Sequence, residues 1–163
     1  MITALEQGLI YAIVALGVYL TFRILDFPDL TVDGSFTLGA AVTAKMIIDG
    51  GSPLLATAAG FGAGLIAGVV TGLLHTKGKI NGLLAGILTM IALYSVNLRV
   101  MGKSNLSLLR ETTLITPLRD NALLGTASSI MIFAVVVLLI KLVIDWFLHT
   151  DLGLAIQATG DNE

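Results

Sequence analysis

The chain has 163 residues, of which 56% are hydrophobic and only 12% are charged. Soluble domains carry about 25% charged residues, so this composition excludes an ordinary water-soluble globular domain. The formal net charge of −2 gives no reason to expect binding to nucleic acid. Because the chain has no cysteine, disulfides and thiolate metal sites are excluded.

Five predominantly apolar segments follow one another along the chain: residues 3–22, 35–48, 54–74, 80–98 and 122–148. A helix needs roughly 17–25 apolar residues to cross a bilayer. We therefore expect an all-α fold, a polytopic transmembrane helix bundle of about five membrane segments. The second segment is short for a crossing, so we expect it to be broken or preceded by an irregular segment.

Residues 26–34, with the sequence DFPDLTVDG, separate the first apolar segment from the second. Pro28 and Gly34 disfavour a continuous helix here, and Thr31 or Asp33 is suited to cap the helix that follows. Ionisable groups at membrane depth are costly and usually functional, and irregular backbone there lines a cavity or is buried in protein. Two interpretations remain open, an ordinary interfacial loop and part of a substrate pathway. The pathway hypothesis includes Asp29, Thr31, Asp33, Gly34, Ser35, Phe36 and Gly39.

Small residues recur at every fourth position of the third apolar segment. Such a ridge lets two helix backbones approach closely in a membrane. It predicts helix packing, either within the chain or at a subunit interface. The ridge consists of Ala56, Gly60, Gly64, Gly68 and Gly72.

Two pairs of opposite charge lie at the ends of apolar segments. Lys141 and Asp145 are one helical turn apart, and Trp146 beside them is typical of an aromatic belt. Lys45 and Asp49 have the same spacing. We interpret the first pair as an interfacial ion pair.

The sequence lacks the motifs of common catalytic and metal sites. No Walker A loop, nucleophile elbow or HExxH pattern occurs. His75 and His149 are far apart and have no further ligands near them in the sequence. We therefore expect a chain that is not an enzyme and that needs no metal and no cofactor. A third hypothesis is an acid/base pair of Asp29 and Asp33, although nothing in the sequence ensures its geometry.

The stretch GLIYAIVALGVYLTFRILDFPDLTVDGSFTLGAA, which begins at Gly8, resembles the start of permease subunits of bacterial ATP-binding-cassette (ABC) importers. The branch is the one that includes branched-chain amino acid permeases. Within it, RILDFPDLTVDGSFTLGAA is similar to a subgroup described as tryptophan/tyrosine permeases or permeases of uncharacterised substrate. The tail TDLGLAIQATGDNE resembles the beginning of the family's cytoplasmic coupling segment, which docks on the ATPase.

The resemblance covers essentially the whole chain and implies one transmembrane permease domain over residues 1–163. Such permeases are usually longer, so the chain resembles an N-terminal half that stops inside the coupling segment at 151–163. The coupling residues implied are Asp151, Leu152, Gly153, Ala158, Gly160, Asn162 and Glu163.

The resemblance also implies partners and an orientation. The partners are a cytoplasmic ABC ATPase, an extracytoplasmic substrate-binding protein, a second permease copy in a homodimer, and membrane lipid, with no nucleic acid. Loop charges do not decide the orientation. A cytoplasmic coupling segment places the N-terminus outside a bacterial inner (cytoplasmic) membrane.

The leading hypothesis is therefore the permease subunit of an ABC importer that moves a small, amino-acid-like solute. The alternative is a half-permease that transports nothing itself and serves as a membrane assembly module paired with another chain.

Overall fold

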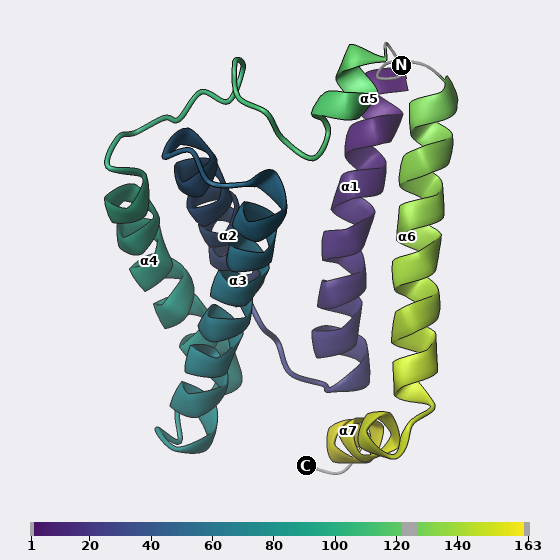
Figure 1. Cartoon of the computed structure of the whole chain (residues 1–163). Helices are drawn as coiled ribbons and strands as arrows, with labels where there is room; N and C mark the ends of the chain where they lie inside the picture. The colour runs from purple at the N-terminus through teal and green to yellow at the C-terminus, as the bar shows by residue number, and fades with distance from the viewer. Residues whose placement is uncertain (1, 122–126, 162–163) are drawn as a thin grey trace. The chain divides into compact units, whose positions relative to one another are not determined.

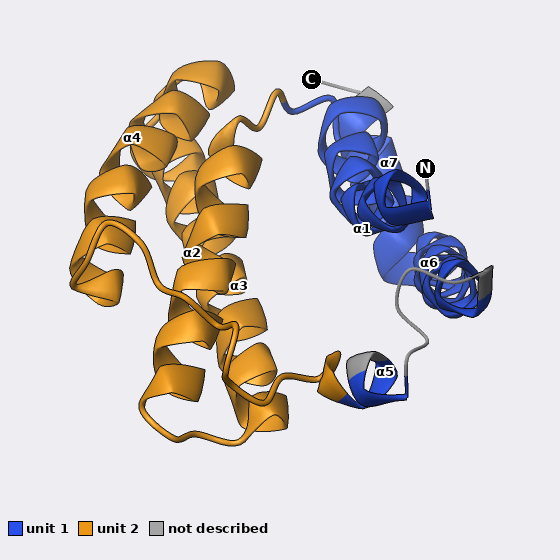
Figure 2. Cartoon of the chain, turned by 90° about the horizontal axis from the view of Figure 1, so that it is seen from above, with its two compact units in different colours: residues 1–27, 117–163 blue, residues 28–116 orange. Residues whose placement is uncertain are grey.

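The computed structural model describes residues 2–121 and 127–161 (Figure 1). Its regular structure within these ranges is helical throughout, which confirms the all-α prediction. The elements are α1 (Ile2–Tyr19), the π-helix η1 (Leu20–Ile24), α2 (Thr31–Ile48), α3 (Pro53–Thr76), α4 (Gly82–Met101), α5 (Thr116–Asp120), α6 (Ala127–Leu148) and α7 (Asp151–Asp161). The chain divides into two compact units, residues 1–27 with 117–163 and residues 28–116 (Figure 2).

Four helical stretches of the described chain are long and apolar enough to cross a membrane: Ile2–Ile24, Pro53–Thr76, Gly82–Met101 and Ser128–Leu148. They correspond to the first, third, fourth and fifth segments expected from the sequence. The chain is therefore a multi-pass membrane protein. The second segment forms α2, a continuous helix of 18 residues that does not meet the same criteria of length and composition.

The start of α2 differs in detail from the expectation. Neither Thr31 nor Asp33 caps the helix; instead the Asp29 carboxylate accepts a hydrogen bond of 2.8 Å from the backbone N–H of Thr31. Thr31 is the first helical residue, and its hydroxyl is 2.7 Å from that of Thr71 on α3. A carboxylate two residues upstream satisfies a helix N–H that has no partner inside the helix. The irregular segment therefore ends at Leu30.

Helices α2, α3 and α4 of the unit 28–116 alternate in direction. The hydroxyl contact of Thr31 with Thr71 joins the beginning of α2 to the end of α3, so these two helices are antiparallel. Gly34 lies beside Met90, and Thr37 one turn later bonds Asn97, so α2 and α4 run in the same direction.

The α2–α3 contact is close because glycine occupies both sides of it. A Cβ added at Gly60 would lie 2.7 Å from the carbonyl oxygen of Gly39. Any side chain at position 60 would therefore force the two helices to move. One turn further along α2, the Thr43 hydroxyl donates to the Ala56 carbonyl over 3.1 Å. Small residues and interhelical hydrogen bonds are the usual means by which helices associate in lipid.

In the other unit, α1 and α6 run parallel. Ser129, at the beginning of α6, donates to the carboxylate of Glu6, near the beginning of α1. At the far end, Tyr19 and Lys141 line one groove. Both helices therefore cross a membrane in the same direction.

This parallel arrangement bears on the number of crossings. An odd number of crossings must separate two spans that run the same way, and α3 and α4 supply only two. Helix α2, antiparallel to α3, is suited to supply the third. Its 18 residues extend about 27 Å, close to the roughly 30 Å of a bilayer's hydrocarbon core. The geometry thus favours the five crossings expected, whereas the single domain over residues 1–163 stays a prediction.

Candidate substrate pocket between α2 and α4

A pocket of about 430 Å³ opens beside the crossing of α2 and α4. Its lining combines one carboxylate, three hydroxyl groups and an apolar wall. The lining residues are Asp33, Gly34 and Thr37 from α2, and Met90, Ile91, Tyr94 and Ser95 from α4.

Gly34 determines how closely the two helices approach at the pocket. It is buried, and a Cβ at this position would lie 3.1 Å from both the Met90 Cα and the Leu93 Cβ. The side chains that flank it on α2, Asp33 and Thr37, therefore stand at the edge of the helix contact, where the pocket opens.

A buried amide fixes the polar edge of the pocket. Asn97 Nδ2 donates to Thr37 Oγ1 over 2.7 Å and to the Gly34 carbonyl over 3.4 Å. The Thr37 hydroxyl in turn donates to the Gly34 carbonyl over 2.8 Å, so it accepts from Asn97. Asn97 Oδ1 is buried and has no hydrogen-bond partner among the described residues. Such a group is costly to bury, which is typical of functional regions rather than of an optimised core.

The lining defines what the pocket can hold. Asp33 is the one charged residue among those that line it, and it is exposed on the first turn of α2. A carboxylate with neighbouring hydroxyls can bind a cationic, hydrogen-bonding group, and Met90 with Ile91 can cover an apolar body. A small solute with an ammonium group matches this chemistry.

The remaining residues of the expected pathway lie on other sides of α2. Thr31 is buried against α3, and Gly39 faces the Gly60 carbonyl. Ser35 donates to the Val32 carbonyl in its own helix. Phe36 is exposed. The structure thus brings two of the expected residues, Asp33 and Gly34, into the pocket.

Asp29 has a separate position. Its carboxylate caps α2, and it lies 3.5 Å from the position of a Cβ built on Gly86 of α4. Asp29 is not among the residues that line the pocket with Asp33. The two carboxylates therefore have different surroundings, which gives no support to an acid/base pair.

Sequence reasoning missed the contribution of α4 and one residue of α2. These residues are Thr37, Met90, Ile91, Tyr94, Ser95 and the supporting Asn97. Asn97 did carry a signal, because an amide inside an apolar membrane segment is costly unless it is bonded. No signal in the sequence showed that Tyr94 and Ser95 face the pocket, because their position depends on where α4 crosses α2.

The ridge on α3 is divided between two environments. Ala56 and Gly60 are buried in the contact with α2. A Cβ built on any of the other three members, Gly64, Gly68 and Gly72, meets no described atom within 4 Å. A packing role for those three stays a prediction.

The expected coupling segment forms α7. Gly153 is buried where the chain turns from α6, and Leu152 is 70% exposed. Gly160 packs directly against the Ile24 carbonyl at the end of η1. Asp151 and Ala158 are exposed on the helix. Asn162 and Glu163 lie outside the described residues.

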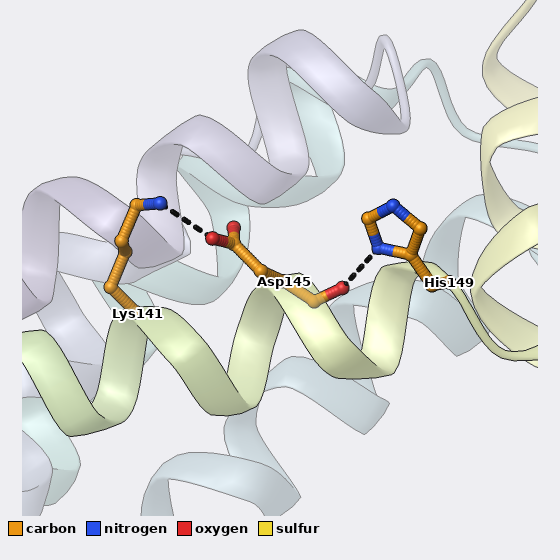
Figure 3. Close-up of polar contacts among 3 residues, drawn as sticks. All are labelled: Lys141, Asp145 and His149. Atoms are coloured by element: carbon orange, nitrogen blue, oxygen red, sulfur yellow. Dashed lines mark hydrogen bonds and ion pairs between the residues drawn. The ribbon is translucent and has the colours of Figure 1, made fainter.

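The charged pair on α6 is formed as expected (Figure 3). Lys141 Nζ lies 2.5 Å from Asp145 Oδ2, and the ring Nδ1 of His149 lies 2.7 Å from the Asp145 carbonyl oxygen. Within residues 2–121 and 127–161, no group of three or more His, Asp or Glu side chains is placed to hold a metal ion.

Parallel apolar spans define a multi-pass membrane protein, and a solute-sized pocket lies beside one of its helices. The chain belongs to the family of permease components of branched-chain amino acid transport systems, whose sequence model matches residues 1–163. The resemblance seen in the sequence is therefore confirmed.

Curated relatives agree with this family. The chain is 45% identical to a tyrosine transport system permease protein of Clostridioides difficile, over 99% of this chain and 52% of the relative. It is 42% identical to an uncharacterised protein of Rickettsia prowazekii, over 100% of this chain and 55% of the relative. It is 29% identical to a ribose import permease protein of Escherichia coli, over 98% of this chain and 49% of the relative. The chain spans about half the length of these relatives, and no solved structure matches it.

Proposed function

We propose that this chain forms a membrane-spanning part of an ABC importer and that an amino-acid-like solute passes through the pocket between α2 and α4. The observation that carries the proposal is the pocket of about 430 Å³ with Asp33 as its one charged lining residue. Family membership supports the transport role. A solute with an ammonium group suits the carboxylate better than an uncharged sugar does, and one relative is named a tyrosine permease.

The proposed orientation puts α7 in the cytoplasm and the N-terminus outside a bacterial inner membrane. Helix α7 follows the span Ser128–Leu148 and exposes Leu152 and Leu154, which are suited to contact a cytoplasmic ATPase. An external binding protein would deliver the solute from the other side. A second permease copy would complete the channel.

Helix α7 is also placed to transmit movement. Gly160 lies against the carbonyl end of η1, which continues α1. A displacement of α7 by the ATPase would therefore act on α1 and on residues 25–30, which lead into α2. Transport requires two states that differ in which side reaches the pocket, and ATP would shift their populations.

Uptake measurements on a neutralised pocket test this proposal. The chain is reconstituted in proteoliposomes with its ATPase and binding protein, and uptake of radiolabelled amino acids is followed. Asp33→Asn should reduce uptake at least tenfold, about the effect of losing one charged hydrogen bond. Asp49→Asn is the matched control, because Asp49 is at the other end of α2 and pairs with Lys45 over 2.7 Å. Equal uptake by the two variants would exclude Asp33 from the pathway.

A second candidate is the assembly module, because the open face of α3 at Gly64, Gly68 and Gly72 suits close packing against another membrane helix. It predicts stable co-purification with the ATPase and another membrane chain, without uptake by the chain and ATPase alone. ATP-dependent uptake without a further membrane chain would exclude it.

A further inference from the structure

A second cavity of about 430 Å³ lies within the unit formed by residues 1–27 and 117–163. It is an open groove along the seam between α1 and α6, far along the sequence from the pocket at Asp33. Its lining is apolar except at one end. The lining residues are Leu9, Ala12, Ala15, Leu16 and Tyr19 from α1, and Ala134, Val137, Leu138 and Lys141 from α6.

The groove is lined mainly by apolar side chains. Its α1 residues recur at intervals of three and four, so they form one stripe along the helix. Ala12 and Ala15 leave room in the middle of that stripe, where a larger side chain would fill the space. An apolar lining along two neighbouring helices suits a hydrocarbon chain.

One end of the groove has the chemistry of a membrane interface. Lys141 lines it together with Tyr19, which is 50% exposed. Trp146, on the next turn of α6, is 71% exposed. Aromatic side chains and lysines with extended stems gather at the depth of lipid headgroups. Lys141 lies seven residues before the end of the span Ser128–Leu148, and its long stem can carry the ammonium group towards that end. The apolar stripe therefore leads from the middle of the span to a cation nearer its end.

Lys141 retains capacity to bind an anion. An ammonium group has three N–H donors, and the contact with Asp145 uses one of them. Both partners of this pair are about half exposed, so the ammonium group can be reached from outside the protein. A phosphate oxygen can thus accept a hydrogen bond from Lys141 without disturbing the helix.

We propose that this groove binds one phospholipid, with an acyl chain along the stripe of α1 and α6 and its phosphate at Lys141. The occupant follows from the cation at one end of the groove and the apolar lining that leads away from it. The proposal does not rest on the transport function, because it concerns another cavity in the other unit.

Native mass spectrometry of the full chain in detergent tests the headgroup. Dioleoyl phosphatidylglycerol and dioleoylglycerol are the probes, since they share acyl chains and differ in the phosphate. The double variant Lys141→Gln/Asp145→Asn removes the ion pair without changing net charge. We expect the native chain to retain phosphatidylglycerol in preference to dioleoylglycerol. We expect the variant to retain severalfold less phosphatidylglycerol, because the phosphate loses the charge-assisted hydrogen bond from the Lys141 ammonium group.

The variant Lys45→Gln/Asp49→Asn is the matched control, because this pair has the same spacing at the end of α2 and lines neither cavity. Its lipid retention should equal that of the native chain. Equal loss in both double variants, or equal retention of both lipids by the native chain, would overturn the proposal.

A second substitution tests the acyl chain and leaves the charges intact. Ala12→Leu fills the groove and should lower phosphatidylglycerol retention at least severalfold. Ala92→Leu, on the exposed face of α4, should not. Circular dichroism and a single elution peak establish that each variant folds. Unchanged retention by Ala12→Leu would overturn the proposal, as would a cross-link from Ala15→Cys that captures a transmembrane helix in place of lipid.

Discussion

The amide of Asn97 on α4 donates to the hydroxyl of Thr37 on α2 over 2.7 Å, and this bond joins the two walls of the pocket that contains Asp33. The bond connects residues separated by 60 positions in the chain. Interhelical hydrogen bonds in membranes contribute about 0.6 kcal/mol on average and up to about 1.7 kcal/mol. Its larger role is geometric, because it holds Thr37 in a single orientation at the pocket edge.

Replacing Thr37 by valine should therefore destabilise the unit 28–116. Thr37→Val keeps the shape but removes the nearer of the two acceptors of the buried Asn97 amide, which keeps only the Gly34 carbonyl at 3.4 Å. The cost should be about 1–3 kcal/mol in the free energy of unfolding. The control Thr57→Val removes a hydroxyl that donates only to Pro53 in its own helix, and should change stability by less than about 0.5 kcal/mol. Unfolding in mixed micelles measures both. An equal loss of stability in both variants would show that the bond to Asn97 does not stabilise the unit.

Substitution by alanine should have opposite effects on stability at different glycines of α3. Gly60→Ala places a methyl group against the Gly39 carbonyl and the Thr43 hydroxyl, so it should separate α2 from α3 and lower stability by about 1–3 kcal/mol. Gly64→Ala is the control on the same helix, because its Cβ meets no described atom within 4 Å.

Alanine favours a helix over glycine by up to about 1 kcal/mol, so Gly64→Ala should be neutral or stabilising in the isolated chain. The thermal unfolding of both variants in the same detergent provides the comparison. A destabilising Gly64→Ala would instead indicate that this face of α3 is covered in the purified protein.

The contact of α7 with η1, like the contact at Gly60, should be disrupted by one added methyl group. Gly160→Ala would meet the Ile24 carbonyl and should release α7 from the end of α1, although alanine favours the helix itself. Ala158→Val is the control, since Ala158 is exposed on α7. Limited proteolysis near Thr150 should be several times faster in Gly160→Ala alone. Equal cleavage rates would show that the Ile24 contact does not hold α7.

The sequence predicted most helices to within a few residues because their signals are local. A long apolar run and Ser52 before Pro53 are enough to place α3, whose first turn Ser52 caps. The site was only partly predictable. Asp33 was conspicuous as a charge beside an apolar run, whereas Tyr94 and Ser95 join it only because Gly34 admits α4 at that point.

The ridge on α3 illustrates the same limit. A spacing of four residues drifts by about 40° per step around a helix of 3.6 residues per turn. The contact face therefore continues from Ala56 and Gly60 to Ala67 and Thr71, which are buried, and leaves Gly68 exposed. Regular spacing identified a close helix contact, but helical geometry decided how far along the helix that contact extends.

The buried contact between Glu6 and Ser129 joins α1 and α6 near their first turns and should be essential to that unit. Ser129→Ala removes a donor from a carboxylate that is only 7% exposed in a membrane-spanning segment. A buried acceptor that loses a donor costs about 1–3 kcal/mol. Ser128→Ala, at the exposed neighbouring position, is the control and should be nearly neutral.

Glu6→Gln distinguishes hydrogen bonding from charge at this contact. The amide oxygen of glutamine can still accept from Ser129, so this variant should retain more stability than Ser129→Ala if the hydrogen bond is what joins α1 to α6. Unfolding in mixed micelles, with protease protection of α1 as a local readout, ranks the variants. A larger loss in Glu6→Gln than in Ser129→Ala would show that the carboxylate's charge, rather than its bond to Ser129, holds the beginning of α1 in place.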